Sequence, residues 1–220
     1  MAPHKSSALP ASDHAREIIK RLKRVYPEAA TALRHSNPLQ LLIATILSAQ
    51  CTDQRVNIVT KDLFKRYRLA IDFSESSVKE LERYIHSTGF YHAKAKNIIG
   101  CCKRLVEHHK GKVPETMEEL VELPGVGRKT ANVVLGNAFG KAAGIVVDTH
   151  VKRLSERLGL STNENPEKVE LDLMKCVPKK DWILFPHLFI SHGRNHCQAR
   201  KPQCSECPLN DICPSTERYT

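Results

Sequence analysis

Two adjacent cations at the start of an expected helix, Arg128 and Lys129, are the residues most suited to chemistry in this chain. They follow the turn Gly125-Val126-Gly127 and precede an apolar stretch with helical spacing. A helix N-terminus carries roughly +0.5 of an elementary charge and disfavours cations by about 0.3–1 kcal/mol each. The glycines can leave backbone N–H groups free to point at a phosphate. The pattern predicts a phosphate grip formed by residues 125–128, with the amine of Lys129 beside it.

Other phosphate-binding loops fit this segment less well. A Rossmann loop follows a strand, whereas Thr116 and Glu119 form a capping box that predicts a short helix over residues 118–123. A P-loop requires a glycine where this chain has Glu122. The predicted order is therefore helix, hairpin, helix. An ordinary two-helix turn with glycine caps and solvated cations is the alternative.

Four cysteines near the C-terminal end have the spacing C-x6-C-x2-C-x5-C: Cys197, Cys204, Cys207 and Cys213. Four thiolates in so short a segment can hold a tetrahedral zinc ion or a [4Fe–4S] cluster. The spacing matches neither the zinc ribbons nor the ferredoxin run, so it does not choose the metal. Disulfides are the alternative. The other cysteines show no complementary pattern, and no signal peptide is recognisable, which favours a reducing compartment.

Helical periodicity dominates the elements that must position these groups. We expect helices over residues 13–25, 38–49, 53–67, 77–86, 92–109, 148–158, 166–176 and 181–194, with Asn37 as the N-cap of the second. The run Ile145-Val146-Val147 is typical of a strand, but nothing nearby supplies a pairing partner. The sequence therefore predicts an all-α fold.

The composition favours a polyanionic partner. Lys and Arg number 34 against 24 Asp and Glu, a formal net charge of +10. Such an excess promotes binding to nucleic acid through counterion release, although many basic proteins bind nothing specific. No apolar run approaches the roughly 18 residues of a membrane span, so we expect a soluble protein without a membrane partner.

Taken together, these motifs resemble the endonuclease III family of helix-hairpin-helix DNA glycosylases. The resemblance runs from about residue 18 to 213 and rests on L-P-G-V-G-R-K-T-A at 123–131, V-D-T-H at 147–150, S-A-Q-C-T-D at 48–53 and the cysteine loop at 197–213. It implies that the four cysteines hold a [4Fe–4S] cluster and that the hairpin binds the DNA backbone. It also implies that Lys129 is the nucleophile and that Asp148 assists it.

A lysine nucleophile gives base removal and strand cleavage in one site. Its attack on the anomeric carbon yields an imine, which acidifies the neighbouring sugar hydrogen and permits β-elimination. The amine must be neutral, so we expect burial, the helix N-terminus and Arg128 to lower the pKa of Lys129 from its ordinary value of about 10.4. Asp148 would counter charge developing on the sugar. The alternative for Asp148 is a helix N-cap.

The target base must leave the duplex to reach the lysine, so side chains are needed to fill the gap. Gln50 lies in the family's S-A-Q motif, and Phe90 follows Gly89 in a turn where the family carries an apolar wedge. We therefore expect both residues to contact DNA. Their alternatives are a helix cap for Gln50 and a core position for Phe90.

Related branches of the superfamily differ at informative positions. Adenine glycosylases resemble this chain but carry a glutamate where it has Ile46. Thymine-mismatch glycosylases lack the lysine, and the 8-oxoguanine branch lacks the cysteine loop. The resemblance thus implies excision of oxidised pyrimidines from double-stranded DNA and cleavage at abasic sites, by a monomer in a prokaryotic cytoplasm, associated with the nucleoid. A catalytically silent DNA-binding module and an oxidation-sensing regulator are the two other functional hypotheses.

The family architecture also implies a domain organisation with two helical lobes. A disordered tail would cover residues 1–12. A six-helix lobe would span 36–147 and contain the helix-hairpin-helix motif at about 116–138. The discontinuous second lobe would join 13–35 to 148–220 and carry the cluster loop at 197–213.

Overall fold

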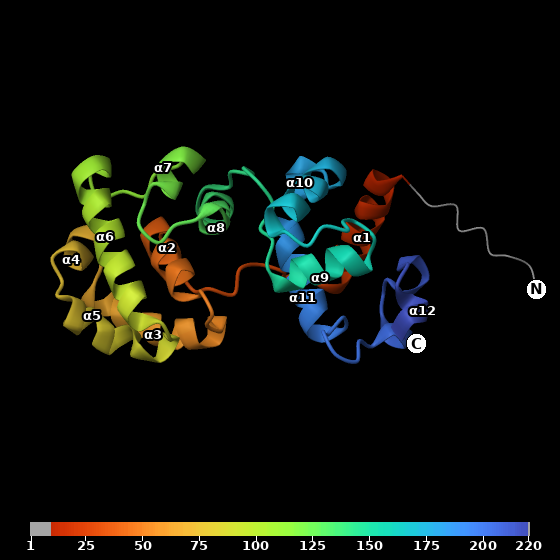
Figure 1. Cartoon of the computed structure of the whole chain (residues 1–220), viewed down its shortest axis with the longest axis horizontal. Helices are drawn as coiled ribbons and strands as arrows, with labels where there is room; N and C mark the ends of the chain where they lie inside the picture. Colours follow the sequence, from red (N-terminus) through yellow and green to blue (C-terminus); the bar gives the residue numbers. More distant parts are fainter. Residues whose placement is uncertain (1–9, 220) are drawn as a thin grey trace, which may run out of the picture. The chain divides into compact units, whose positions relative to one another are not determined.

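A computed structural model describes residues 10–219 of the 220-residue chain. The described residues form helices and loops without any strand, which confirms the all-α prediction (Figure 1). The run Ile145–Val147 is part of a loop. Residues 1–9 of the expected tail lie outside the described residues, but Ala11 and Ser12 already belong to the first helix. The helix therefore begins two residues before the predicted start.

The α-helices, in chain order, are α1 Ala11–Val25, α2 Pro38–Leu47, α3 Asp53–Arg66, α4 Ala70–Ser74, α5 Val78–Ile85, α6 Tyr91–His109, α7 Met117–Val121, α8 Arg128–Phe139, α9 Thr149–Arg157, α10 Pro166–Cys176, α11 Leu184–Asn195 and α12 Thr216–Tyr219. Short 3-10 turns are η1 His86–Thr88, η2 Lys179–Asp181, η3 Cys204–Glu206 and η4 Asn210–Ile212. No helix in the described part of the chain is both long and apolar enough to cross a membrane.

The chain folds into two compact units. One unit is Thr31–Ala143 and holds α2 to α8, and the other joins the residues up to Ala30 to those from Gly144 onward. The unit borders thus lie at 30/31 and 143/144, whereas the family architecture implied 35/36 and 147/148. Each unit has its own core of buried apolar side chains.

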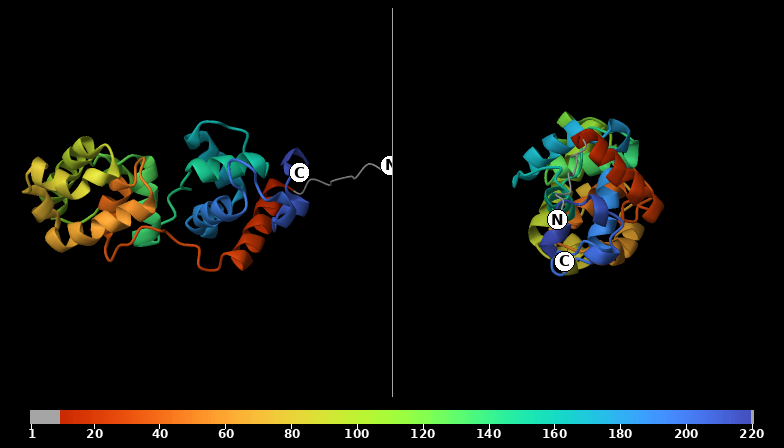
Figure 2. Two further views of the ribbon diagram at one scale, coloured as in Figure 1. Left: turned by 90° about the horizontal axis from the view of Figure 1, so that it is seen from below. Right: turned by 90° about the vertical axis from the view of Figure 1, so that its right-hand side faces the viewer.

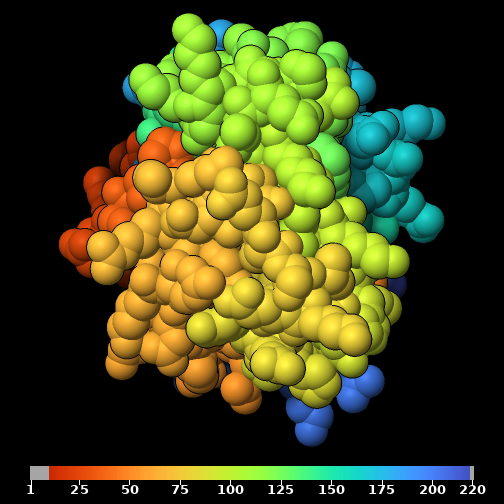
Figure 3. Space-filling model, turned by 90° about the vertical axis from the view of Figure 1, so that its left-hand side faces the viewer, coloured from red at the N-terminus to blue at the C-terminus, as the bar shows by residue number. Residues whose placement is uncertain are grey.

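The core of the Thr31–Ala143 unit is built around α2. All residues from Leu41 to Leu47 are buried, because α2 packs against α3, α6 and α8. The helix begins as predicted, since the side chain of Asn37 accepts a hydrogen bond from Gln40 N at 2.9 Å and Pro38 occupies the first turn. On the other side of the unit, α4 and α5 pack against α6 (Figures 1 and 3).

The second unit packs α1 against α10 and α11, and α11 against α9 (Figure 2). Phe185 and Phe189 of α11 are fully buried, with ring centroids 4.0 Å apart. The bounds of α10 are as predicted, because Asn165 caps the helix by accepting from Glu167 N and Lys168 N, and Pro166 follows. The apolar face of α1 completes this core with Ile18 and Leu22.

Several helix boundaries differ from the prediction, and the differences in three helices have identifiable reasons. α11 begins at Leu184 rather than 181, because Lys179–Asp181 forms a 3-10 turn after Pro178. α2 ends at Leu47 rather than 49, since the chain turns at Ser48 and reaches a left-handed conformation at Gln50. α7 spans Met117–Val121 rather than 118–123, because the hairpin turn already begins at Glu122.

Candidate active site and cysteine loop

The turn between α7 and α8 requires a glycine at position 125. Gly125 has φ +77°, a left-handed conformation that side chains rarely adopt. A Cβ atom there would lie 2.8 Å from Cβ of Asn97 on α6, so the hairpin also packs too closely to admit an alanine. The turn closes with a hydrogen bond from Val126 N to Leu123 O at 3.1 Å. Backbone conformation and packing therefore fix the hairpin against α6.

Gly127 serves a different purpose, because its backbone is extended and a Cβ atom there would meet no described atom within 4 Å. It is the N-cap of α8, and Ala131 N donates to its carbonyl at 2.9 Å. The neighbouring Val126 side chain is 6% exposed and belongs to the core, so only its backbone can take part in binding. Open space over Gly127 leaves room for a phosphate at the start of α8.

Arg128 and Lys129 form the first turn of α8, and both side chains are exposed. The prediction that burial desolvates the amine of Lys129 is wrong for the chain by itself. The first turn of α8 faces solvent at this position, while the helix turns its buried side, including Ala131 and Val134, toward the core. Lys129 is thus accessible to a ligand that approaches the hairpin.

Asp148 is the N-cap of α9, as its alternative interpretation held. One carboxylate oxygen accepts a hydrogen bond from Val151 N at 2.8 Å, and the side chain is half-buried. Because a carboxylate has further lone pairs, the cap leaves it able to accept other hydrogen bonds. Its charge also acts on His187 of α11: burial lowers the pKa of His187, and Asp148 partly opposes that shift.

Gln50 and Phe90 are exposed on two loops of the Thr31–Ala143 unit. Phe90 is 66% exposed, so the core interpretation of this residue is wrong. The helix-cap interpretation of Gln50 is also wrong, because α2 ends at the C-cap Ser48 and Gln50 lies beyond it. Both residues have left-handed backbone, with φ 52° at Gln50 and φ 47° at Phe90. Non-glycine residues in this conformation are uncommon and cluster at functional sites.

The four cysteines of the C-terminal loop line one pocket, together with Arg157, His192 and His196. None of the described cysteines forms a disulfide, which excludes that alternative. No group of three or more His, Cys, Asp or Glu side chains among the described residues is arranged to hold a single metal ion. The four thiols around this pocket are the number of ligands that a [4Fe–4S] cluster takes.

Two arginines of α9, the buried Arg157 and the half-buried Arg153, hold this loop in place. Arg157 donates to Gln198 O at 2.8 Å and Ala199 O at 3.0 Å, and its guanidinium also reaches Cys197 Sγ at 3.2 Å. Arg153, one turn earlier, donates to Cys197 O at 2.9 Å. The guanidinium of Arg157 therefore fixes the backbone of the loop and places positive charge beside a candidate ligand.

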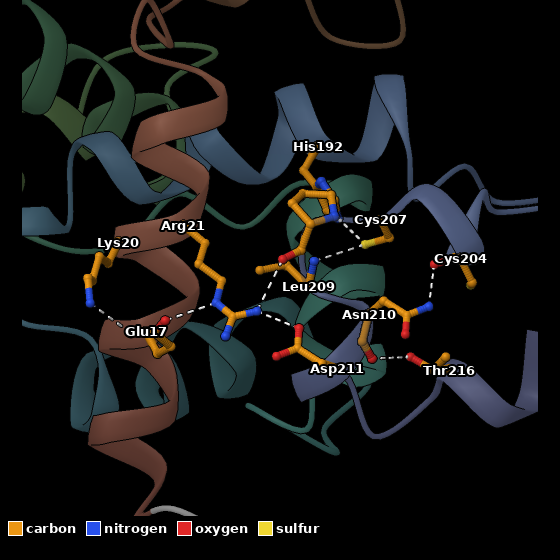
Figure 4. A network of polar contacts seen from close by, with 11 residues as sticks. Glu17, Lys20, Arg21, His192, Cys204, Cys207, Leu209, Asn210, Asp211 and Thr216 are labelled. Carbon is orange, nitrogen blue, oxygen red and sulfur yellow. Dashed lines mark hydrogen bonds and ion pairs between the residues drawn. The ribbon is translucent and has the colours of Figure 1, made fainter.

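Further polar contacts surround Cys204 and Cys207 (Figure 4). Leu209 N donates to Cys207 Sγ at 3.4 Å, and Nε2 of His192 lies 3.5 Å from the same sulfur. The side chain of Asn210 donates to Cys204 O. On α1, Arg21 donates to Pro208 O and pairs with Asp211. Hydrogen bonds to cluster sulfurs are a means by which proteins tune iron–sulfur groups.

Burial raises the pKa of two of the four loop thiols, those of Cys204 and Cys207. Burial, followed by the charge of the other cysteines, raises the pKa of Cys207 to about 11, and the same causes raise the pKa of Cys204. A cationic centre between the sulfurs would remove this penalty, because metal binding requires and stabilises thiolates. The donor set therefore suits a bound iron–sulfur group electrostatically as well as in number.

Sequence reasoning missed Arg153, Arg157 and His192. Nothing in their spacing on α9 and α11 distinguishes them from other helix residues. Charged residues on helices are usually exposed to solvent, so a buried role was not expected. The one available signal was that Arg153 and Arg157 are four residues apart in the helix predicted over residues 148–158, so that both lie on one face.

Comparisons with known proteins agree with this arrangement. Residues 43–179 match the family model described as HhH-GPD superfamily base excision DNA repair protein, and residues 197–213 match the iron-sulfur binding domain of endonuclease III. Endonuclease III of Synechocystis sp. is 56% identical over 92% of this chain and 93% of its own length. Endonuclease III of Escherichia coli K12 is 44% identical over 92% and 95%.

Solved structures give the same result. A structure described as a non-covalent endonuclease III–DNA complex superposes with a TM-score of 0.89 at 45% identity, covering 94% of this chain and 97% of that one. A structure of a trapped endonuclease III–DNA covalent intermediate matches equally well. The chain therefore belongs to the endonuclease III family and is a base excision repair DNA glycosylase and AP lyase with a [4Fe–4S] cofactor.

Proposed function

We propose that this enzyme excises oxidised pyrimidines from double-stranded DNA and cleaves the resulting abasic site, with Lys129 as the nucleophile. The observation that carries the proposal is the exposed lysine in the first turn of α8, directly after a glycine hairpin. Two solved structures of endonuclease III contain DNA, one of them as a trapped covalent intermediate, which supports a covalent mechanism here. The preference for oxidised pyrimidines rests on the family resemblance.

The hairpin is proposed to hold a backbone phosphate next to the reacting sugar. The open surface at Gly127 and the positive end of the α8 helix dipole favour an anion at this point. Arg128 adds charge to the same end of the helix. A bound phosphate would also offset the cost of placing two cations at a helix N-terminus.

The proposed reaction then proceeds in balanced steps. The lone pair of neutral Lys129 Nζ forms a bond to the anomeric carbon while the glycosidic bond breaks, and the base leaves with the electron pair of that broken bond and gains a proton. Loss of a proton from nitrogen and opening of the sugar ring give the imine. Removal of the neighbouring sugar proton expels the 3′ phosphate by β-elimination, and water hydrolyses the imine to release the lysine. We assign Asp148 the role of countering positive charge on the sugar.

Two further assignments complete the proposal. Gln50 and Phe90 would enter the duplex and fill the gap left by the extruded base, as their exposure and backbone conformation favour. Cys197, Cys204, Cys207 and Cys213 would be the cluster ligands, which the shared pocket and the four thiol donors support. The bound cluster would organise the loop rather than take part in base excision.

The proposal also includes a cellular location and an oligomeric state. The matched relatives named above are bacterial. We propose a monomer that acts on nucleoid DNA in a prokaryotic cytoplasm, since one chain supplies every residue assigned above. Sedimentation of the purified protein with and without a lesion-containing duplex tests the monomer.

Borohydride trapping tests the nucleophile. The protein should cut a duplex at a single thymine glycol, and borohydride added during turnover should join protein to DNA, because an imine is reducible and a non-covalent complex is not. Lys129→Gln should abolish trapping while it keeps most of the DNA affinity, since the backbone grip remains. Lys112→Gln, which removes another exposed lysine of the same unit, is the matched control and should trap normally.

Three results would contradict the proposal. Normal trapping by Lys129→Gln would place the nucleophile on another amine. Binding to the duplex without cleavage or trapping by the unaltered protein would favour a docking module instead. If mild oxidation of the protein changes its DNA affinity and no strand is ever cut, an oxidation-sensing regulator would be favoured.

A further inference from the structure

Lys94 of α6 is a charged residue that the proposed reaction does not use. It is only 4% exposed, in a unit whose core is built mainly of apolar side chains. Its ammonium donates to Leu47 O and to Thr88 O, each at 2.8 Å. Burial lowers the pKa of Lys94, and the charge of nearby Cys51 opposes that shift. A buried cation is costly unless it is hydrogen-bonded, so its two acceptors are the reason for its position.

The two carbonyls lie 41 positions apart in the sequence, at the ends of α2 and η1. Leu47 is the last residue of α2, and its carbonyl is among those that a helix leaves without an internal partner. Thr88 ends η1 and is itself buried. Gln50 follows Leu47 by three residues, and Phe90 follows Thr88 by two. One ammonium group thus joins the starts of both exposed loops.

Both loops carry backbone strain directly after these carbonyls. Gln50 and Phe90 account for two of the four non-glycine residues with positive φ in the described part of the chain. Such conformations persist only where the surroundings determine them strongly. On the Phe90 side, Lys94 N also donates to Phe90 O at 3.0 Å, so that backbone and side chain of Lys94 hold the same loop. These contacts fix where each exposed side chain emerges.

We propose that Lys94 is a positioning residue, whose ammonium locks the loops of Gln50 and Phe90 into one rigid edge that probes duplex DNA and holds it open during base extrusion. This inference rests on the proposed function, in which Gln50 and Phe90 fill the gap in the duplex. A lysine suits the task because its compact ammonium has three donors and can serve two carbonyls that converge from different loops. An apolar side chain would leave both carbonyls buried without this donor.

Lys94→Met tests the inference, since methionine keeps the unbranched stem and removes the ammonium. Single-turnover excision of thymine glycol should fall by about tenfold more than cleavage at a preformed abasic site, because holding the gap matters most when an intact base must be extruded. A 2-aminopurine next to the lesion should show a smaller fluorescence rise on binding. The amide of Lys94→Gln can still donate two hydrogen bonds. Its loss of thymine glycol excision should therefore be smaller than that of Lys94→Met, but its activity should remain below that of the unaltered protein.

A stability control separates positioning from folding. Leu105→Ala removes a fully buried side chain of the same helix, eleven residues further along, and should lower both activities in proportion to the folded fraction. Kinetics are measured below the melting transition of every variant. If Lys94→Met behaves like Leu105→Ala, with both activities reduced equally, the lysine is only structural and the inference is wrong.

A mutant cycle distinguishes failure of this inference from failure of the proposed function. Gln50→Ala and Phe90→Ala should each show the same preferential loss of excision. Adding Lys94→Met to the Gln50→Ala, Phe90→Ala double variant should then cost little more. If the two alanine variants show no preference, the gap-filling assignment itself fails. If they do and Lys94→Met adds its full effect independently, only the role of Lys94 is overturned.

Discussion

At the scale of single residues, Asp148 combines a structural task with a proposed chemical one. It caps α9 through Val151 N, and its charge is the feature assigned to the reaction. Asparagine and aspartate are about equally good N-caps, so the two tasks can be separated by substitution. Asp148→Asn should leave the melting temperature nearly unchanged but slow borohydride trapping by about a hundredfold, the scale of losing one preorganised electrostatic group.

The control for this experiment is Asp148→Ala, which removes cap and charge together. It should lower the free energy of unfolding by about 1 kcal/mol, measured by urea titration, and slow trapping as much as Asp148→Asn does. Unchanged trapping by a stable Asp148→Asn protein would leave Asp148 as a helix cap only. DNA affinity, measured by fluorescence anisotropy, should stay close to that of the unaltered protein in both variants.

At the scale of elements, α9 links the start of the proposed chemistry to the cysteine loop through Arg157. Arg157 donates to two loop carbonyls from two nitrogens of one planar guanidinium. Arg157→Lys therefore keeps the positive charge but loses this paired geometry. The purified protein should contain about four irons and absorb visible light, as expected for a cubane held by four thiolates. Arg157→Lys and Cys204→Ser should both lose that absorption faster in air, with Cys204→Ser also starting from less iron.

The matched control is Arg21→Met. Arg21 reaches the same loop from α1, at Pro208 O and Asp211, but Asp211 is largely exposed. Exposed ion pairs contribute little, about 0–1 kcal/mol, so this variant should keep its colour nearly as long as the unaltered protein. Equal rates of colour loss for Arg21→Met and Arg157→Lys would mean that general loop stability, rather than the guanidinium beside Cys197, protects the cluster.

The elements also show which parts of this protein the sequence could predict. Helices with a local start signal were predicted well, as the pairs Asn37-Pro38 and Asn165-Pro166 illustrate, since a cap is a contact between near neighbours. The four cysteines were found because four thiols in one short segment are rare. The five-residue α4 has too few residues for a periodic pattern and was missed.

What could not be predicted depends on partners distant in the sequence. Lys94 has the residue type of a solvated helix position, and only the meeting of Leu47 O and Thr88 O shows why it is buried. The left-handed backbone of Phe90 was likewise invisible, because phenylalanine gives no signal for positive φ. For Lys129, the expected burial was wrong, since a periodic pattern does not say which helix face a neighbour covers at its first turn.

At the scale of the whole molecule, the formal net charge of +10 should make binding to DNA strongly dependent on salt. Each phosphate contact releases condensed counterions, so the logarithm of the binding constant should fall linearly with the logarithm of salt concentration. Arg128→Ala should reduce that slope by about one, as expected for loss of one phosphate contact. The measurement is anisotropy of a labelled duplex with an abasic-site analogue, over a series of salt concentrations.

A second arginine variant distinguishes a local phosphate contact of Arg128 from the effect of the protein's overall net charge. Arg68→Ala removes the same unit of charge from an exposed residue between α3 and α4, outside the hairpin and both exposed loops. If overall charge governs binding, both variants should lower the affinity alike. If the hairpin grips a phosphate, Arg128→Ala alone should change the slope, while Arg68→Ala shifts the affinity only slightly at low salt, where screening is weakest. Equal slopes for Arg128→Ala and the unaltered protein would remove Arg128 from the phosphate contacts and leave the grip to the backbone N–H groups of the hairpin and α8.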